Sequence, residues 1–299
     1  MILLTGATGT IGREVLRLLP PGLPVRVMAR SPERVACGRP EVRVVRGDFG
    51  DHESLLRAAR GTRTAFLVTS RIGDDDLRFL NAAREAGVRR VVKLSAAGVL
   101  DPLADDAITR WQRRNEELWV HSGLEWTLLR PRAFMSNALA WAPGVRERGV
   151  VRALYGSSGH ACVDPRDVAA VAVLALTEQG HAGRGHTLTG PAAVSAAQQT
   201  AHLGEVLGRR LRFEEMDADE ARAALRGRYP REVADALVEK AERLRAGGKE
   251  EVGTAVPALL GRPAGSFRSW ARDHAGAFGP APAAEGETRP RCGTGPAGS

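Results

Sequence analysis

The sequence predicts an α/β protein built on a doubly wound parallel sheet, with a smaller, mainly helical C-terminal lobe. Short apolar runs rich in β-branched residues alternate with helix-length spacers through the first half of the chain. Strands this apolar are typical of a parallel sheet that helices cover on both faces. After Pro131 the pattern changes to glycines, scattered aromatic residues and long helical stretches. This change indicates a second lobe.

The expected strands follow one another in a βαβ pattern. They occupy residues 2–5, 25–29, 42–45, 65–69, 90–95 and 125–130. Helices are expected between them, for example over Arg13–Leu19 and Leu77–Ala86. Residues typical of helix starts and ends fit this order, namely Ser31-Pro32, Asp51 and Asp74–Asp76 at starts and Gly87 at an end.

The same change in pattern suggests the domain organisation. We expect a first domain over residues 1–160 and a smaller lobe over residues 161–275 that is interleaved with it. That lobe is expected to be mostly helical, with short strands near residues 186–189 and 211–214. From Gly276 the chain is rich in Gly, Pro and Ala without periodicity, so residues 276–299 are expected to form a disordered tail.

Composition argues against a disordered, fibrous, secreted or membrane-spanning protein. The 299 residues are 43% hydrophobic and 26% charged, close to the average for soluble globular proteins. No apolar stretch approaches the roughly 20 residues that cross a bilayer, and no basic region precedes an apolar run at the start. The three cysteines, Cys37, Cys162 and Cys292, are too widely spaced for a disulfide framework or a zinc site. We therefore expect a cytoplasmic protein with no membrane contact and no bound metal.

The formal net charge of +8 raises the question of a nucleic-acid partner. Nearly all of the positive charge is arginine, and it is spread along the chain among Asp and Glu instead of forming a basic block. We expect no direct binding to nucleic acid.

The strongest chemical signal is the glycine-rich turn between the first strand and the first helix. Gly6, Gly9 and Gly12 have the spacing GxxGxxG. Gly6 allows a tight turn, Gly9 lets the backbone approach a pyrophosphate, and Gly12 permits close packing of helix on strand. The alternative is a loop that only closes a βα unit. The position directly between a strand and a helix favours a dinucleotide site.

The residue after the second strand indicates which dinucleotide binds. Sites for NAD place an acidic residue there for the ribose 2′-hydroxyl, whereas sites for NADP use an arginine for the 2′-phosphate. This chain has Arg30, about 20 residues beyond the glycines, with Ser31 and Arg34 beside it as further partners for the phosphate. The alternative is a surface arginine in an arginine-rich chain. We predict that NADP(H) is preferred over NAD(H).

Several short motifs together resemble those of one family. They are residues 5–12, Arg30, Gly47–Phe49, residues 94–98, 122–137, 163–169 and 188–191, and the closing segment 266–278. Over Met1 to Phe278 the chain resembles the NmrA-like atypical short-chain dehydrogenases/reductases. It is most similar to bacterial NAD(P)H-binding oxidoreductases of that group, which are related to quinone, triphenylmethane and festuclavine-type reductases. The resemblance implies a Rossmann-type sheet and a nicotinamide cofactor.

The resemblance also implies roles for individual residues. Gly6, Thr8, Gly9, Thr10, Ile11 and Gly12 would hold the pyrophosphate, Arg30 the 2′-phosphate, Asp48 and Phe49 the adenine end, and Thr69 and Ser70 the far ribose. Ser95 falls where ordinary short-chain dehydrogenases keep a catalytic serine. The alternative for Ser95 is a small polar residue at the end of a buried strand.

The chain departs from ordinary short-chain dehydrogenases at their YxxxK pair, in which the lysine lowers the pKa of the phenol for proton transfer. Tyr155 and Tyr229 lack a lysine four residues on, and Ile108 and Gln112 stand where such a pair would lie. Without that acid, we expect substrates that accept hydride without protonation by a side chain. Quinones, imines or iminium ions, and cationic dyes are of this kind.

The candidate substrate pocket follows the sixth strand, at the edge of the sheet where α/β proteins bind ligands. Its residues are Phe134, Met135, Asn137 and Trp141. Core packing is the alternative, because aromatic and Met side chains are commonly buried.

The leading hypothesis is an NADPH-dependent oxidoreductase that transfers hydride to a small, electron-poor organic substrate. The alternatives are an NADP(H)-sensing regulatory protein of NmrA type, which binds the dinucleotide without turnover, and a scaffold whose pocket is filled. The enzyme is favoured because residues 134–141 are rich in pocket-type side chains and no DNA-reading motif is present. The expected partner is the substrate, and monomer and homodimer both remain open.

Overall fold

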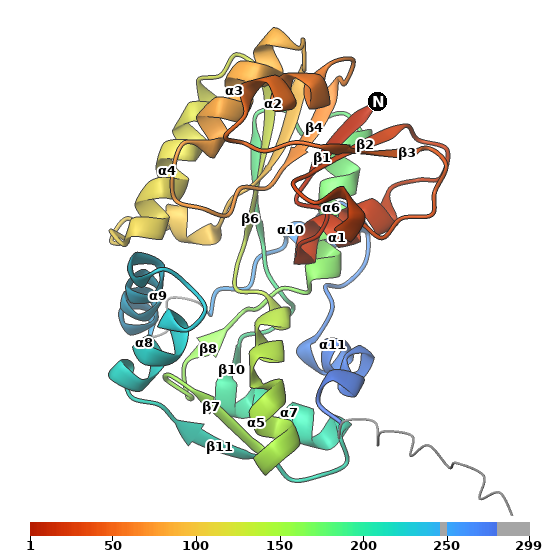
Figure 1. Ribbon diagram of the computed structural model, residues 1–299. Helices are drawn as coiled ribbons and strands as arrows, with labels where there is room; N and C mark the ends of the chain where they lie inside the picture. The colour runs from red at the N-terminus through yellow and green to blue at the C-terminus, as the bar shows by residue number, and fades with distance from the viewer. Residues whose placement is uncertain (246–249, 280–299) are drawn as a thin grey trace, which may run out of the picture.

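The computed structural model describes residues 1–245 and 250–279 and contains the predicted doubly wound sheet. Seven strands, all parallel, lie in the order β3-β2-β1-β4-β5-β6-β9 (Figure 1). The strand order reverses between β1 and β4, which is the point where such sheets bind ligands. The strands are β1 (Ile2–Thr5), β2 (Val25–Ala29), β3 (Val42–Arg46), β4 (Thr64–Leu67), β5 (Arg90–Leu94), β6 (Glu125–Pro131) and β9 (Arg184–Leu188).

Helices cover both faces of this sheet, as its apolar strands require (Figure 1). One face shares an apolar core with α1 (Thr10–Leu18), α6 (Pro165–Thr177) and α10 (Ala255–Leu260). The other face shares a second core with α2 (His52–Ala59), α3 (Asp75–Glu85) and α4 (Ala107–Val120). Both α6 and β9 follow residue 160 in the chain but pack on the first sheet, so the two lobes are interleaved.

The second lobe faces the carboxyl ends of the sheet strands (Figure 1). Its two small sheets pair β7 with β11 in parallel and β8 with β10 antiparallel. Its strands are β7 (Val150–Ala153), β8 (Gly159–His160), β10 (Val194–Ser195) and β11 (Arg212–Glu215). Its helices are α5 (Ala142–Arg148), α7 (Ala196–Val206), α8 (Ala218–Arg226), α9 (Arg231–Leu244) and α11 (Phe267–Asp273). Short 3₁₀ helices occur in both lobes, namely η1 (Pro32–Arg34), η2 (Ala97–Leu100), η3 (Met135–Trp141) and η4 (Ala275–Ala277).

The structure corrects two local expectations. Ser31-Pro32 begins only the three-residue η1, since the backbone of Val35 is already extended. The chain from Gly276 continues into η4, and Phe278 is fully buried in the core of the second lobe. The remainder of the expected tail, residues 280–299, lies outside the described residues.

Helix ends elsewhere follow the sequence signals. The carboxylate of Asp51 accepts the backbone N–H of Ser54 at 3.2 Å and caps α2. Gly87 takes a φ of +77° just after α3, which a residue with a side chain rarely adopts. In residues 1–245 and 250–279, no helix is long and apolar enough to cross a membrane.

Candidate active site

The glycine-rich turn forms a cradle of bare backbone at the carboxyl end of β1. Gly6 has a φ of +69°, and a Cβ on it would lie 2.9 Å from Cβ of Val68. A Cβ on Gly12 would lie 2.3 Å from the carbonyl oxygen of Gly6, so α1 can approach the turn only because Gly12 has no side chain. The backbone N–H of Gly9 donates to the carbonyl of Gly6 at 2.9 Å and closes the turn. Such a cradle fits the pyrophosphate of a dinucleotide.

A cavity of about 530 Å³ opens over this turn, and we call it the cofactor cavity. Its walls include the predicted cofactor residues Gly6, Thr8, Gly9, Arg30, Ser31, Asp48, Phe49 and Ser70. Arg34 lines it as well, whereas the acidic residue Glu33 does not. Within the described residues the side chain of Arg30 is exposed and makes no hydrogen bond or ion pair. The end of β2 therefore presents cations to the cavity.

Other predicted cofactor residues lie close by but do not line this cavity. Thr10 begins α1, Ile11 is 4% exposed in the core beneath it, and Gly12 packs against the turn. Thr69 faces a neighbouring cavity, while Ser70, the next residue, faces the cofactor cavity. The two cavities therefore meet at the carboxyl end of β4.

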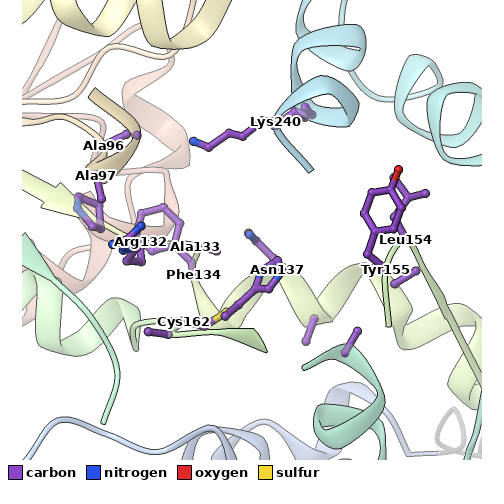
Figure 2. Close-up of a pocket in the computed structure, with 18 of the residues that line it drawn as sticks. Ala96, Ala97, Arg132, Ala133, Phe134, Asn137, Leu154, Tyr155, Cys162 and Lys240 are labelled. Carbon is purple, nitrogen blue, oxygen red and sulfur yellow. The ribbon is translucent and has the colours of Figure 1, made fainter. Parts of the chain in front are cut away.

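The neighbouring cavity, of about 570 Å³, is lined by residues of both lobes, and we call it the substrate cavity (Figure 2). Ser95, Phe134, Asn137 and Trp141 line it. Met135 does not, because its side chain is 2% exposed in the apolar core of the second lobe. The structure thus brings most of the predicted pocket residues to the same cavity as Ser95.

The hydroxyl of Ser95 is held by a carboxylate. Ser95 Oγ donates to Glu116 Oε1 at 2.5 Å, and Arg130 forms a two-pronged ion pair with Glu116, with Nη2 2.6 Å from Oε2 and Nε 2.9 Å from Oε1. Ser95 and Glu116 are both buried. The proton of this serine is therefore engaged away from the cavity, and its oxygen offers only lone pairs to a ligand.

Comparison with known proteins identifies the family. The family model described as NAD(P)H-binding matches residues 6–179. A (4-alkanoyl-5-oxo-2,5-dihydrofuran-3-yl)methyl phosphate reductase of Streptomyces griseus is 54% identical over 94% of this chain and all of that protein. The chain belongs to this family of NAD(P)H-binding oxidoreductases.

More distant relatives agree with the assignment. An NAD(P)H azoreductase of Xenophilus azovorans is 37% identical over 94% of this chain and all of that protein. The structure of an NADPH-dependent quinone oxidoreductase from Escherichia coli, complexed with NADPH, superposes with a TM-score of 0.78 at 26% identity, covering 92% of this chain and 99% of that one. This oxidoreductase is thus of the NmrA-like atypical short-chain dehydrogenase/reductase type.

A buried charge network lies beneath the cofactor end of the oxidoreductase's substrate cavity. Lys93 Nζ donates to Thr69 Oγ1 at 2.6 Å and lies 3.2 Å from Asp76 Oδ1. The carboxylate of Asp76 also accepts from Thr69 Oγ1 at 2.6 Å and from Trp119 Nε1 at 2.7 Å. Burial lowers the pKa of Lys93, and the charge of Asp76 opposes that shift. The network fixes Thr69 where the two cavities meet.

Sequence reasoning missed this network, although a signal was present. Lys93 sits within the apolar run of residues 90–94, on a strand expected to be covered on both faces. A lysine buried in such a strand needs a partner.

Further polar residues of the second lobe and of α4 line the substrate cavity of the oxidoreductase. Gln112 is 8% exposed, and its Oε1 has no hydrogen-bond partner among the described residues. Tyr155 has a φ of 51°, a left-handed conformation that is unusual for a residue other than glycine. Lys240 projects from α9, and burial lowers its pKa, with Asp106 opposing and Arg243 adding to the shift.

Residues 1–245 and 250–279 contain no group of His, Cys, Asp or Glu side chains that could hold a metal ion.

Proposed function

We propose that this oxidoreductase uses NADPH to reduce a carbon–carbon double bond that two carbonyl groups make electron-poor. The observation that carries this proposal is the substrate cavity beside the cofactor cavity, with a serine whose proton is already donated to Glu116. The position of the usual tyrosine is taken by Ile108, and Gln112 replaces its lysine. A substrate suited to this site accepts hydride without an acid from this helix.

The preference for NADPH rests on the cations at the end of β2. Arg30 and Arg34 line the cofactor cavity, and Ser31 lies between them in the chain. An arginine side chain can bind a phosphate through two parallel N–H···O bonds, whereas it has no comparable partner in a ribose hydroxyl.

The class of substrate follows from chemistry and from the relative with 54% identity. When bound, NADPH supplies a hydride. That relative is named for a butenolide. In this compound the ring double bond joins a carbon that bears the alkanoyl group to a carbon that bears a CH₂–O–phosphate group. A hydride delivered to the ring carbon that bears the CH₂–O–phosphate group would move the π pair onto the enolate that the lactone and alkanoyl carbonyls share. A proton from water then restores the saturated carbon.

This chemistry suits the residues present. An enolate shared by two carbonyls is stable enough to form without an acid positioned beside it, so the protein has only to bind and orient the substrate and to exclude side reactions. The azoreductase and the quinone oxidoreductase among the relatives are named for acceptors that are also electron-poor.

The test is oxidation of NADPH with a panel of acceptors: the butenolide phosphate, a quinone, an azo dye and an unactivated ketone. We expect turnover of the butenolide at least about 100-fold faster than of the ketone, because the ketone needs an acid in the transition state. Equal rates would contradict the proposal. NADPH binding, seen as a rise in melting temperature, without turnover of any acceptor would favour the sensor hypothesis instead.

Replacing Ser95 by alanine is expected to lower kcat/KM with the butenolide by less than about 10-fold, since only a hydrogen bond to the pocket wall is lost. Steady-state kinetics measure this, with Ser136→Ala on η3 as a control that does not line the cavity. A loss of about 1000-fold would instead assign Ser95 a role as proton donor, because general acids contribute on that scale.

A further inference from the structure

Lys240 brings to the substrate cavity a cation that has no counter-ion among the described residues. Lys240 lies on α9 of the second lobe, and its Nζ reaches across to η2 of the first lobe, where a Cβ on Gly98 would lie 2.9 Å from it. Figure 2 shows its side chain extending into the cavity toward the wall that holds Ala96, Ala97 and Arg132. In the described part of the chain, Lys240 makes no hydrogen bond or ion pair.

The nearest acidic groups are already paired with another cation. Arg243, one turn further along α9, lies 3.0 Å from Asp101 Oδ2 and 3.4 Å from Asp106 Oδ2. These carboxylates act on Lys240 only at longer range, and the guanidinium groups of Arg132 and Arg243 repel it. Partly buried cations are normally paired, and within residues 1–245 and 250–279 no anion lies in contact with Lys240.

Arg132 brings a second positive charge to the same cavity. It follows β6, lines the cavity beside Phe134, and its Nη2 lies 3.3 Å from Glu251 Oε2, a carboxylate whose side chain is 85% exposed. Two cations from different lobes thus line the substrate cavity, which suits a ligand with a double negative charge.

We propose that Lys240, with Arg132 facing it, forms a subsite that binds a phosphate monoester on the substrate. The inference rests on the proposed function and specifies which form of the substrate is taken. In the butenolide phosphate, only one CH₂ and one oxygen separate phosphorus from the carbon that accepts hydride. The subsite must therefore lie close to the reacting carbon, and Lys240 meets this requirement because it lies against the loop that follows Ser95 at the end of β5.

The apolar part of the cavity would then receive the alkanoyl chain. Trp141, Leu154 and Leu237 line the cavity, and apolar atoms make up most of its surface. The substrate would lie with its phosphate between the lobes and its chain along the second lobe.

The experiment compares the butenolide phosphate with the same butenolide bearing a free hydroxymethyl group, in the wild type and in Lys240→Met. For the wild type we expect kcat/KM to be about 100-fold higher with the butenolide phosphate than with the hydroxymethyl compound, mainly through a lower KM. The hydroxymethyl compound lacks the charged hydrogen bonds of the phosphate, and their loss has an effect of this size. Lys240→Met should remove most of that preference and leave the hydroxymethyl compound within about 3-fold of the wild-type value. Lys240→Arg, which keeps the charge, should restore part of the preference.

A control variant and a binding measurement separate the possible failures. Arg231 lies on the same helix but is 82% exposed and does not line the cavity. Arg231→Gln should therefore leave kcat/KM for both compounds unchanged. If Lys240→Met slows both compounds equally, or if the wild type does not distinguish them, the phosphate subsite is wrong while the proposed function stands. If neither butenolide is reduced, the proposed function is wrong. The subsite is then tested by binding alone: the butenolide phosphate must raise the melting temperature of the wild type but not that of Lys240→Met.

A measurement without substrate gives independent support. Because Lys240 carries a partly buried charge without a close partner, Lys240→Met should raise the melting temperature of the free protein. A lysine with a purely structural role would lower it on substitution, and that result would overturn the proposal.

Discussion

Replacing Arg30 by aspartate is expected to lower kcat/KM for NADPH by about 1000-fold, while kcat/KM for NADH stays within about 5-fold of its wild-type value. Arg30 lies at the end of β2, lines the cofactor cavity and is exposed. The substitution would remove the charged hydrogen bonds that we propose between Arg30 and the 2′-phosphate, and it would place a carboxylate against that dianion. NADH has a hydroxyl there, which an aspartate can accept from.

The measurement is steady-state kinetics with each cofactor at a fixed concentration of butenolide. Arg43→Asp is a matched control, because Arg43 is an exposed arginine on the edge strand β3 that does not line the cavity. An equal loss with both cofactors, or no loss with either, would show that Arg30 does not read the 2′-phosphate.

Replacing Lys93 by methionine is expected to destabilise the protein by about 3 kcal/mol, the usual effect of removing one partner of a buried ion pair. Both Lys93 and Asp76 are completely buried, with Nζ 3.2 Å from Oδ1. The substitution leaves the carboxylate of Asp76 with only the neutral donors Thr69 and Trp119. The affinity for NADPH should fall as well, because Thr69 loses the donor that helps to fix it.

Urea unfolding with and without NADPH measures both effects. Arg17→Gln serves as the control, since the Arg17–Glu14 pair on α1 has a 58% exposed arginine and should contribute less than about 0.5 kcal/mol. A second variant that also carries Asp76→Asn should recover part of the lost stability, because it removes the unpaired charge. A loss below about 1 kcal/mol in Lys93→Met would mean that Lys93 is neutral in the folded state.

Local features of the fold could be predicted because they depend on neighbouring residues. The apolar runs at residues 2–5 and 25–29 form strands as expected, since such runs need burial on both faces of a sheet. The glycine turn was equally accessible, because only residues without a side chain allow the backbone of Gly6 and Gly12 to come together.

Other features could not be predicted because they depend on the partners a residue finds in space. Met135 belongs to a segment that lines the substrate cavity, yet its own side chain points into the core of the second lobe. Phe278 lies in a stretch rich in glycine and alanine, but its ring packs edge-on against Trp270 in the core of the second lobe. Neither outcome is encoded by the few residues on either side.

By itself the sequence determined the parallel sheet, the glycine cradle and the arginine at the end of β2, because strand burial, backbone freedom and the order of βα units are local or periodic properties. Only the tertiary structure decided that Ser95 is tied to Glu116, that Lys93 pairs with Asp76, and that Lys240 reaches across from the second lobe to the loop after β5. These contacts join residues far apart in the chain. The packing of α3 and α4 on the sheet fixes the first two contacts, whereas the packing of the two lobes fixes the third. Together they set the charge that the substrate cavity presents.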